Sequence, residues 1–196
     1  MFVQIIRART SDPDGVRRQG QRWQEELQPG AEGFVGSTAG VSADGEVVTI
    51  ARFADEDAAR RNSDRPEQGE WWAGMEKLLD EPRFAESSDV ELLHGGGSND
   101  AGFVQVMEGT CSDPDRLRST IADAERMLKE HRPDLIGVLT AFHDGRFTQV
   151  NYFTSEAEAR ENEKKDPPPE ATEQMAAMGE IMSVDSYIDL TEPQLF

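Results

Sequence analysis

The chain has 196 residues, enough for one domain or two small ones. It carries 39 acidic and 20 basic residues, a formal net charge of −19, and such an acidic field argues against nucleic-acid and membrane partners. The single cysteine, Cys111, excludes an internal disulfide, so we expect a reduced, cytoplasmic setting. No apolar run approaches the roughly 20 residues of a membrane helix, and the N-terminal residues show no signal-peptide pattern.

The first half of the sequence recurs in the second half. Residues 2–5 read Phe-Val-Gln-Ile and residues 103–106 read Phe-Val-Gln-Val, while the motif Ser-Asp-Pro-Asp at 11–14 returns at 112–115. Both matches are displaced by 101 positions, whereas the Asp-Gly pairs further along are displaced by 100. An ordered recurrence with one small slip indicates a tandem duplication.

The duplication predicts two domains, a first over residues 1–94 and a second over residues 103–196. Between them, residues 95–102 are rich in glycine, and we expect a flexible linker there. A phosphate-binding glycine loop is the alternative, but the segment has no P-loop lysine and no helix start beside it.

Each copy is expected to contain a strand, a helix, two strands, a helical region and a final strand. In the first copy we expect strands at 2–9, 34–41, 46–53 and 90–93, and helices at 11–29, 55–61 and 71–79. In the second copy we expect strands at 103–110, 135–142, 147–153 and 184–190, and helices at 114–130, from 155 onward and at 173–181. The Asp-Gly pairs indicate a hairpin turn between the two middle strands of each copy.

The motif Ser-Asp-Pro-Asp is typical of a helix N-terminus. Its carboxylates can accept hydrogen bonds from the free backbone N–H groups, and proline fits the first helical turn. Its aspartates could also be metal ligands, but helix initiation explains the spacing better.

The order β-α-β-β-α-β is that of a ferredoxin-like domain, whose antiparallel sheet has helices on one face. The first strand carries apolar residues on both faces, so the second face needs a partner. We therefore predict an α+β fold in which two tandem ferredoxin-like domains pack sheet-to-sheet as an intramolecular barrel, so that the two halves pair within one chain.

The strand-to-helix passages at 53–56 and 153–156, together with the element order and domain size, resemble the dimeric α/β-barrel superfamily. The resemblance is nearest to its antibiotic biosynthesis monooxygenase branch, here as a fused pair. Residues 60–72 resemble a passage in uncharacterised bacterial proteins of the same duplicated layout. The resemblance implies a small-molecule ligand, and a monooxygenase-like activity on an aromatic or polyketide-like substrate without metal or other cofactor.

In cofactor-free monooxygenases of this branch, an Asn and a Trp beside the pocket bind and activate the aromatic substrate for reaction with oxygen. The resemblance therefore implies catalytic roles for Asn62 and Trp71. From their side chains we expect substrate-binding roles for Trp23 and Trp72 as aromatic walls and for Gln4 and Arg60 as hydrogen-bond donors. All three tryptophans lie in the first half, where aromatic walls suit a small-molecule pocket. The alternative is that Trp23 and Trp72 pack the helices onto the sheet. The corresponding places in the second half hold Ala124 and the pair Gln174-Met175.

A polar amide in an apolar strand must be hydrogen-bonded if it is buried. Gln4 and Gln105 are such residues, and we expect them to bond each other across a pseudo-twofold axis; lining a pocket is the alternative. Haem-degrading members of the superfamily need an Asn on this strand and a helical His. The glutamines and the absence of His from the helical regions after the third strand of each copy disfavour that activity.

Other groups offer weaker hypotheses. His143-Asp144 is interpreted as turn chemistry and not as a catalytic pair. Cys111 precedes a helix N-terminus, which could lower its pKa, but an inert thiol is the simpler reading. A non-catalytic ligand-binding or structural protein is the rival class. General acid–base catalysis by a carboxylate is a third, although the sequence offers too many carboxylates to nominate one.

Overall fold

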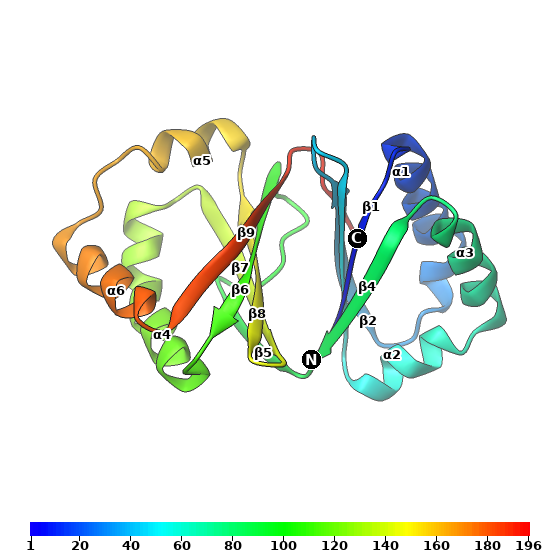
Figure 1. Ribbon diagram of the computed structural model, residues 1–196, viewed down its shortest axis with the longest axis horizontal. Coiled ribbons are helices and arrows are strands. Elements are labelled where there is room, and N and C mark those ends of the chain that lie inside the picture. The colour runs from blue at the N-terminus through cyan, green and yellow to red at the C-terminus, as the bar shows by residue number, and fades with distance from the viewer. The chain divides into compact units, whose positions relative to one another are not determined.

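The computed structural model describes the backbone of residues 1–196 and every side chain except those of residues 123, 124, 126 and 127 (Figure 1). The comparison of Trp23 with Ala124 therefore lies outside the described side chains. The chain divides into two compact units, residues 1–90 with 192–196 and residues 91–191. Each unit contains one five-stranded sheet with helices on one of its faces (Figure 1).

The first unit contains a sheet in the order β10-β2-β3-β1-β4, with every neighbouring pair antiparallel. Its strands are β1 (Phe2–Arg9), β2 (Phe34–Val41), β3 (Glu46–Phe53), β4 (Asp80–Ser87) and β10 (Gln194–Leu195). Its helices are α1 (Pro13–Arg22), which continues into a π-helical turn (Trp23–Leu27) and a 3-10 turn (Gln28–Gly30), then α2 (Glu56–Ser63) and α3 (Pro66–Glu76).

The second unit contains a sheet in the order β5-β7-β8-β6-β9. Its strands are β5 (Asp89–Leu93), β6 (Phe103–Cys111), β7 (Leu135–His143), β8 (Arg146–Phe153) and β9 (Met182–Leu190). Its helices are α4 (Pro114–His131), α5 (Glu156–Asn162) and α6 (Pro169–Gly179). The two copies thus repeat the ferredoxin-like order, and the predicted tandem α+β fold is confirmed.

The helix starts follow the predicted capping chemistry. The Asp12 carboxylate accepts a hydrogen bond from the Gly15 backbone N–H (2.8 Å), and Asp113 does the same for Arg116 (3.0 Å). The carboxylates of the repeated motif therefore serve as N-caps, which agrees with helix initiation. The hairpin prediction also holds, although the two turns differ. In the second copy Asp144 and Gly145 both have positive φ angles, 50° and 72°, as a type I′ turn requires. In the first copy only Gly45 has a positive φ angle, 80°, and its backbone N–H donates to the Ser42 carbonyl at 3.0 Å.

The last strand of the first copy differs from the prediction, whereas the strand predicted at 184–190 is observed as β9 and is followed by the additional strand β10. We expected residues 90–93 to close the first copy, but β4 is the strand that pairs with β1, and β5 extends the second sheet beside β7. Likewise β10, which follows the second copy in sequence, pairs with β2 in the first sheet. β4 has little alternation and contains Pro82, which is tolerated at an edge, so its strand signal was weak. The compact units differ from the predicted domains, 1–94 and 103–196, mainly by this exchange of edge strands.

The helix-facing side of the first sheet has two separate apolar clusters. One is formed by Phe2, Phe53, Ala58 and Ala59 near one end of the strands. The other is formed by Ala8, Val16, Val47, Met75 and Leu79 near the opposite end. Apart from Ile6, the two rungs between them carry small or polar side chains. The middle of this face is therefore not filled by the core.

The opposite face of the first sheet carries apolar residues. Val3 and Ile5 of β1 and Val48 and Ile50 of β3 lie on this side, as the alternation of a strand requires. Such a face suits the predicted sheet-to-sheet pairing, which stays a prediction. Among the described residues, no helix is both long enough and apolar enough to cross a membrane.

Candidate ligand-binding site

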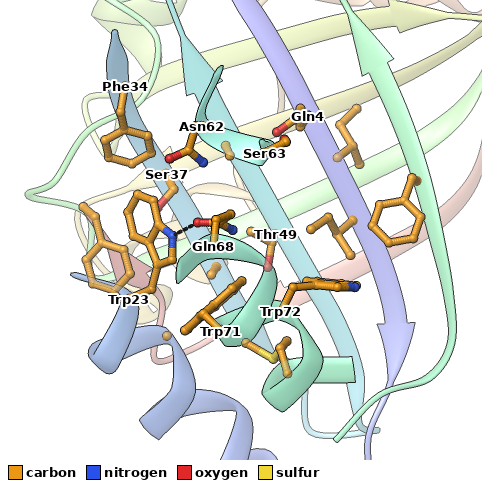
Figure 2. A pocket seen from close by; sticks show the side chains of 18 of the residues that line it. Gln4, Trp23, Phe34, Ser37, Thr49, Asn62, Ser63, Gln68, Trp71 and Trp72 are labelled. Atoms are coloured by element: carbon orange, nitrogen blue, oxygen red, sulfur yellow. Dashed lines mark hydrogen bonds between the residues drawn. The ribbon is translucent and has the colours of Figure 1, made fainter. Parts of the chain in front are cut away.

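A cavity of about 370 Å³ lies in the first unit between the sheet and helices α1 to α3 (Figure 2). Its floor consists of two neighbouring rungs of the sheet. Gln4 pairs with Ala51 and Ala51 with Ser37 in one rung, and Ile6, Thr49 and Ala39 form the next. The small side chains of β2 and β3 in these rungs leave space between the two apolar clusters. The volume falls within the range of about 300–1,000 Å³ usual for small-molecule pockets.

Aromatic rings form the walls of the cavity. Trp23 and Phe34 meet edge to face with their centroids 4.8 Å apart. Trp72 contacts Trp71 at 6.2 Å and Phe84 at 5.4 Å. All five rings line the cavity, so every tryptophan of the chain lies at one site. This location alone does not distinguish a ligand-binding wall from core packing. Packing and cavity lining coexist, because Trp23 is only 7% exposed and also packs against Leu27 and Ala31.

Two of the indole N–H groups are already bonded within the protein. Trp23 Nε1 donates to Gln68 Oε1 at 2.8 Å, as Figure 2 shows. Trp71 Nε1 donates to the Gln19 carbonyl at 2.8 Å, and Gln19 Nε2 donates back to the Trp71 carbonyl at 2.8 Å. These bonds hold the two rings in place, so Trp23 and Trp71 can offer ring surface to a ligand but not an N–H donor. Among the described residues, Trp72 Nε1 has no hydrogen-bond partner.

Asn62 reaches the cavity from the last turn of α2, next to Ser63 (Figure 2). The residue is 6% exposed, and its Oδ1 accepts a hydrogen bond from Arg65 Nη1 at 3.0 Å. Arg65 Nη1 also donates to the Leu27 carbonyl at 3.0 Å, which anchors the guanidinium. The amide is therefore oriented by its oxygen, while Nδ2 has no partner among the described residues and remains available as a donor.

Gln4 lies on the cavity floor, but it does not bond Gln105. Its Nε2 donates to Glu86 Oε1 on the neighbouring strand β4 at 2.9 Å. Gln105 makes the equivalent bond to Asp189 Oδ1 on β9 at 3.0 Å. The expectation that the two glutamines bond each other is wrong. Each glutamine faces the helices and bonds the acidic residue opposite it on the neighbouring edge strand of its own sheet.

Arg60 does not line the cavity. Its side chain is 63% exposed and pairs with Glu56 at 2.7 Å and with Asp57 at 3.9 Å, both on α2 itself. It borders a smaller depression of about 200 Å³ that shares Gln4 and Glu86 with the cavity. Helical spacing explains the difference, since Arg60 and Asn62 are two positions apart and point to different sides of α2.

Residues 192–196, at the end of the chain, contribute to the site although no sequence pattern pointed to them. Gln194 and Phe196 line the cavity. Ser37 and Phe196 exchange backbone hydrogen bonds of 2.8 and 3.1 Å, and Gln194 Nε2 donates to the Arg17 carbonyl at 2.9 Å. Gly20 allows this approach, because a Cβ there would lie 2.6 Å from Gln194 Oε1. No repeat signal could have found these residues, since β10 belongs to a sheet formed mainly by the other copy.

The equivalent rungs of the second sheet are filled by larger side chains. Gln149 and Asn151 stand where the first copy has Thr49 and Ala51, because both pairs face the first strand at the same register. Gln149 Nε2 donates to Asn151 Oδ1 at 2.8 Å, and Asn151 Nδ2 lies 3.3 Å from Met107 Sδ. These amides satisfy each other and occupy the middle of the face. The two copies therefore share a fold but differ at this position.

Burial bears on two further hypotheses from the sequence, those on Cys111 and His143. Burial raises the pKa of the Cys111 thiol, which favours the inert thiol over a reactive one. Burial also lowers the pKa of His143, whose Nε2 lies 3.1 Å from Thr148 Oγ1 beside the hairpin turn. Among the described residues, no group of three His, Cys, Asp or Glu side chains is arranged to hold a metal ion.

Comparisons with known proteins support the fold. No protein-family model and no curated protein matches the sequence. The structure of a candidate monooxygenase from Lactobacillus acidophilus has a TM-score of 0.72 at 10% identity, with coverage of 100% of this chain and 98% of the other. One from Fusobacterium nucleatum has a TM-score of 0.70 at 7% identity, with 96% and 89% covered. An anthrone oxidase-like protein has a TM-score of 0.66 at 10% identity, with 99% and 92% covered. The chain thus shares its fold with these three proteins over nearly its whole length.

Proposed function

We propose that the cavity binds a flat, uncharged aromatic molecule with oxygen substituents, and that the protein oxidises it with dioxygen without metal or flavin. The observation that carries this proposal is the composition of the cavity. Aromatic rings form its walls, amide and hydroxyl groups are spaced along its floor, and no cationic side chain lines it among the described residues. Such a site offers stacking and hydrogen bonds but no counter-ion for an anionic ligand, which suits a neutral ring system.

The three structural neighbours support the choice of reaction class. Two are described as candidate monooxygenases and one as anthrone oxidase-like. Their identities to this chain are 10% or less, so they suggest a class of chemistry and no particular substrate. Anthrone, a three-ring ketone, is a suitable first probe because it is neutral, flat and readily oxidised.

Each predicted site residue has a role in this proposal. Asn62 binds a substrate oxygen through Nδ2, while Trp71 contributes ring surface, because its N–H is bonded to Gln19. Trp72 and Trp23 complete the aromatic wall, and Gln4 contributes hydrogen bonding at the floor. Arg60 donates hydrogen bonds at the neighbouring depression, through which the substrate enters the cavity.

A fluorescence titration tests binding, because every tryptophan of the chain lines the cavity. We expect saturable quenching by anthrone and weaker binding in Trp72→Phe, which removes ring area without disturbing a described hydrogen bond. Consumption of oxygen with anthrone, above the rate in buffer, tests the reaction. Anthrone that neither quenches the fluorescence nor is consumed would refute the proposal.

The rival function is non-catalytic binding of a similar aromatic ligand. One observation favours it. Two of the three indole N–H groups are bonded within the protein, so these rings are held rigidly and can contribute contact surface to a ligand but no hydrogen-bond donor. Saturable quenching without oxygen uptake would select this function. In either case we propose that the protein works in the reduced cytoplasm, with its two halves paired within one chain and with neither nucleic acid nor membrane as a partner.

A further inference from the structure

Glu86 is the one described residue with an ionisable side chain that lines the cavity. It lies on β4, opposite Gln4 of β1 in the register of the sheet. It also borders the smaller depression, so its carboxylate lies where the cavity meets solvent. The sequence contains 39 acidic residues and could not single out this one.

The Glu86 carboxylate has an amide partner but no cation. Gln4 Nε2 donates to Oε1 at 2.9 Å, which orients the group and leaves Oε2 free of any partner among the described residues. Arg60, which borders the same depression as Glu86, pairs instead with Glu56 at 2.7 Å. An oriented carboxylate with one free oxygen is suited to accept a proton.

The equivalent position in the second copy has a different environment. Asp189 occupies the register position of Glu86 and accepts the equivalent hydrogen bond from Gln105 at 3.0 Å. However, Asp189 also forms an ion pair with Arg160, whose guanidinium lies 5.1 Å from the centroid of the Phe103 ring. In the second copy the acid is neutralised and the neighbouring rungs are filled. The uncompensated acid and the open cavity therefore occur together in the first copy.

We propose that Glu86 is the general base that removes a proton from the bound substrate before dioxygen reacts; this inference rests on the proposed function. With anthrone as substrate, the methylene C–H bond breaks, the proton moves to Glu86 Oε2, and the electron pair remains on the ring system. The resulting negative charge is delocalised onto the carbonyl oxygen that Asn62 Nδ2 binds. The anion then reduces dioxygen.

The overall reaction is balanced. Anthrone loses its two methylene hydrogens and gains one oxygen atom to become anthraquinone, and the second oxygen atom leaves as water. Dioxygen is the sole oxidant. Because Glu86 is exposed, its carboxyl group exchanges the proton with water and is ready for the next turnover.

The proton-transfer step can be measured without oxygen. Anthrone deuterated at its methylene is incubated anaerobically with protein in ordinary water, and loss of deuterium is followed by mass spectrometry. We expect the protein to accelerate exchange over buffer, and Glu86→Gln to reduce that acceleration at least about 100-fold, the lower end of general-base contributions. The dissociation constant from fluorescence should change less than about threefold. Asp189→Asn is the matched control and should exchange like the unmodified protein.

A second variant distinguishes loss of the carboxylate from a general disturbance of the site. Glu86→Ala should also lose exchange, and added acetate should restore part of it by supplying a carboxylate at the vacated position. Exchange in Glu86→Gln at the rate of the unmodified protein would overturn the role of Glu86 while leaving the proposed function intact. Absence of both binding and oxygen uptake in the unmodified protein would overturn both.

Discussion

Asn62 has two hydrogen-bonding functions that substitutions can separate. Its Oδ1 accepts from Arg65 Nη1 inside the protein, whereas Nδ2 is free to donate to a ligand. Asn62→Ala removes both functions. Asn62→Asp keeps an acceptor for Arg65 but replaces the donor with a second acceptor. We therefore expect the alanine variant to lose stability and affinity, and the aspartate variant to lose mainly affinity.

The expected change in stability follows from the surroundings of the amide. Asn62 is 6% exposed and bonds a guanidinium, and a hydrogen bond to a charged group contributes about 1.5–3 kcal/mol. Arg65 retains the Leu27 carbonyl and Glu67 as partners, so the lower value applies. Asn62→Ala should lower the free energy of unfolding by about 1.5 kcal/mol, which corresponds to about 3–6 °C in Tm for a chain of this size.

The matched control is Asn162→Ala in the second copy. Asn162 Oδ1 accepts from Lys165 Nζ at an exposed position, and loss of such a bond should cost no more than about 0.5 kcal/mol. Thermal unfolding gives the stability of the variants, and fluorescence titration with anthrone gives the affinity. Asn62→Asp should bind at least about tenfold more weakly, a loss of about 1.4 kcal/mol. Equal stability of the two alanine variants, or unchanged binding by Asn62→Asp, would refute this account of the amide.

Three further outcomes follow from the structure. Ala51→Asn introduces into the first copy the amide side chain that Asn151 has at the same register position of the second. This side chain should occupy part of the cavity and weaken anthrone binding at least about tenfold, whereas Asn151→Ala, the control, should leave binding unchanged. Unchanged binding by Ala51→Asn would contradict the position of the cavity floor. Gly20→Ala places a Cβ 2.6 Å from Gln194 Oε1, so limited proteolysis should cut residues 192–196 faster than in the unmodified protein, and equal rates would contradict the docking of this segment. Burial raises the pKa of Cys111, so its thiol should stay protonated at neutral and mildly alkaline pH. Mass spectrometry should therefore detect alkylation by iodoacetamide only after the protein is unfolded. Rapid labelling of the folded protein at pH 7 would contradict this.

Local chemistry predicted the regular elements well, because the features that specify them are close in sequence. Asp12 and Asp113 cap helices three residues ahead, and Asp-Gly turns set the hairpins. The strand β4 was missed, because its residues are mostly exposed at a sheet edge and carry little apolar alternation. Gln4 was correctly selected as an unusual polar residue, but its partner Glu86 is 82 positions away and could only be identified in the folded sheet.

The sequence by itself determined the duplication, the order of elements, the capping and turn residues, and the concentration of tryptophans in the first half. These properties depend on spacing and side-chain type within short segments. The tertiary structure decided that small residues on two adjacent rungs leave a cavity, that Arg60 points away from it, and that residues 192–196 return to line it. It also decided that Glu86 lacks the cation that Asp189 has. Those features depend on strand register and on contacts between residues far apart in sequence, which no local pattern records.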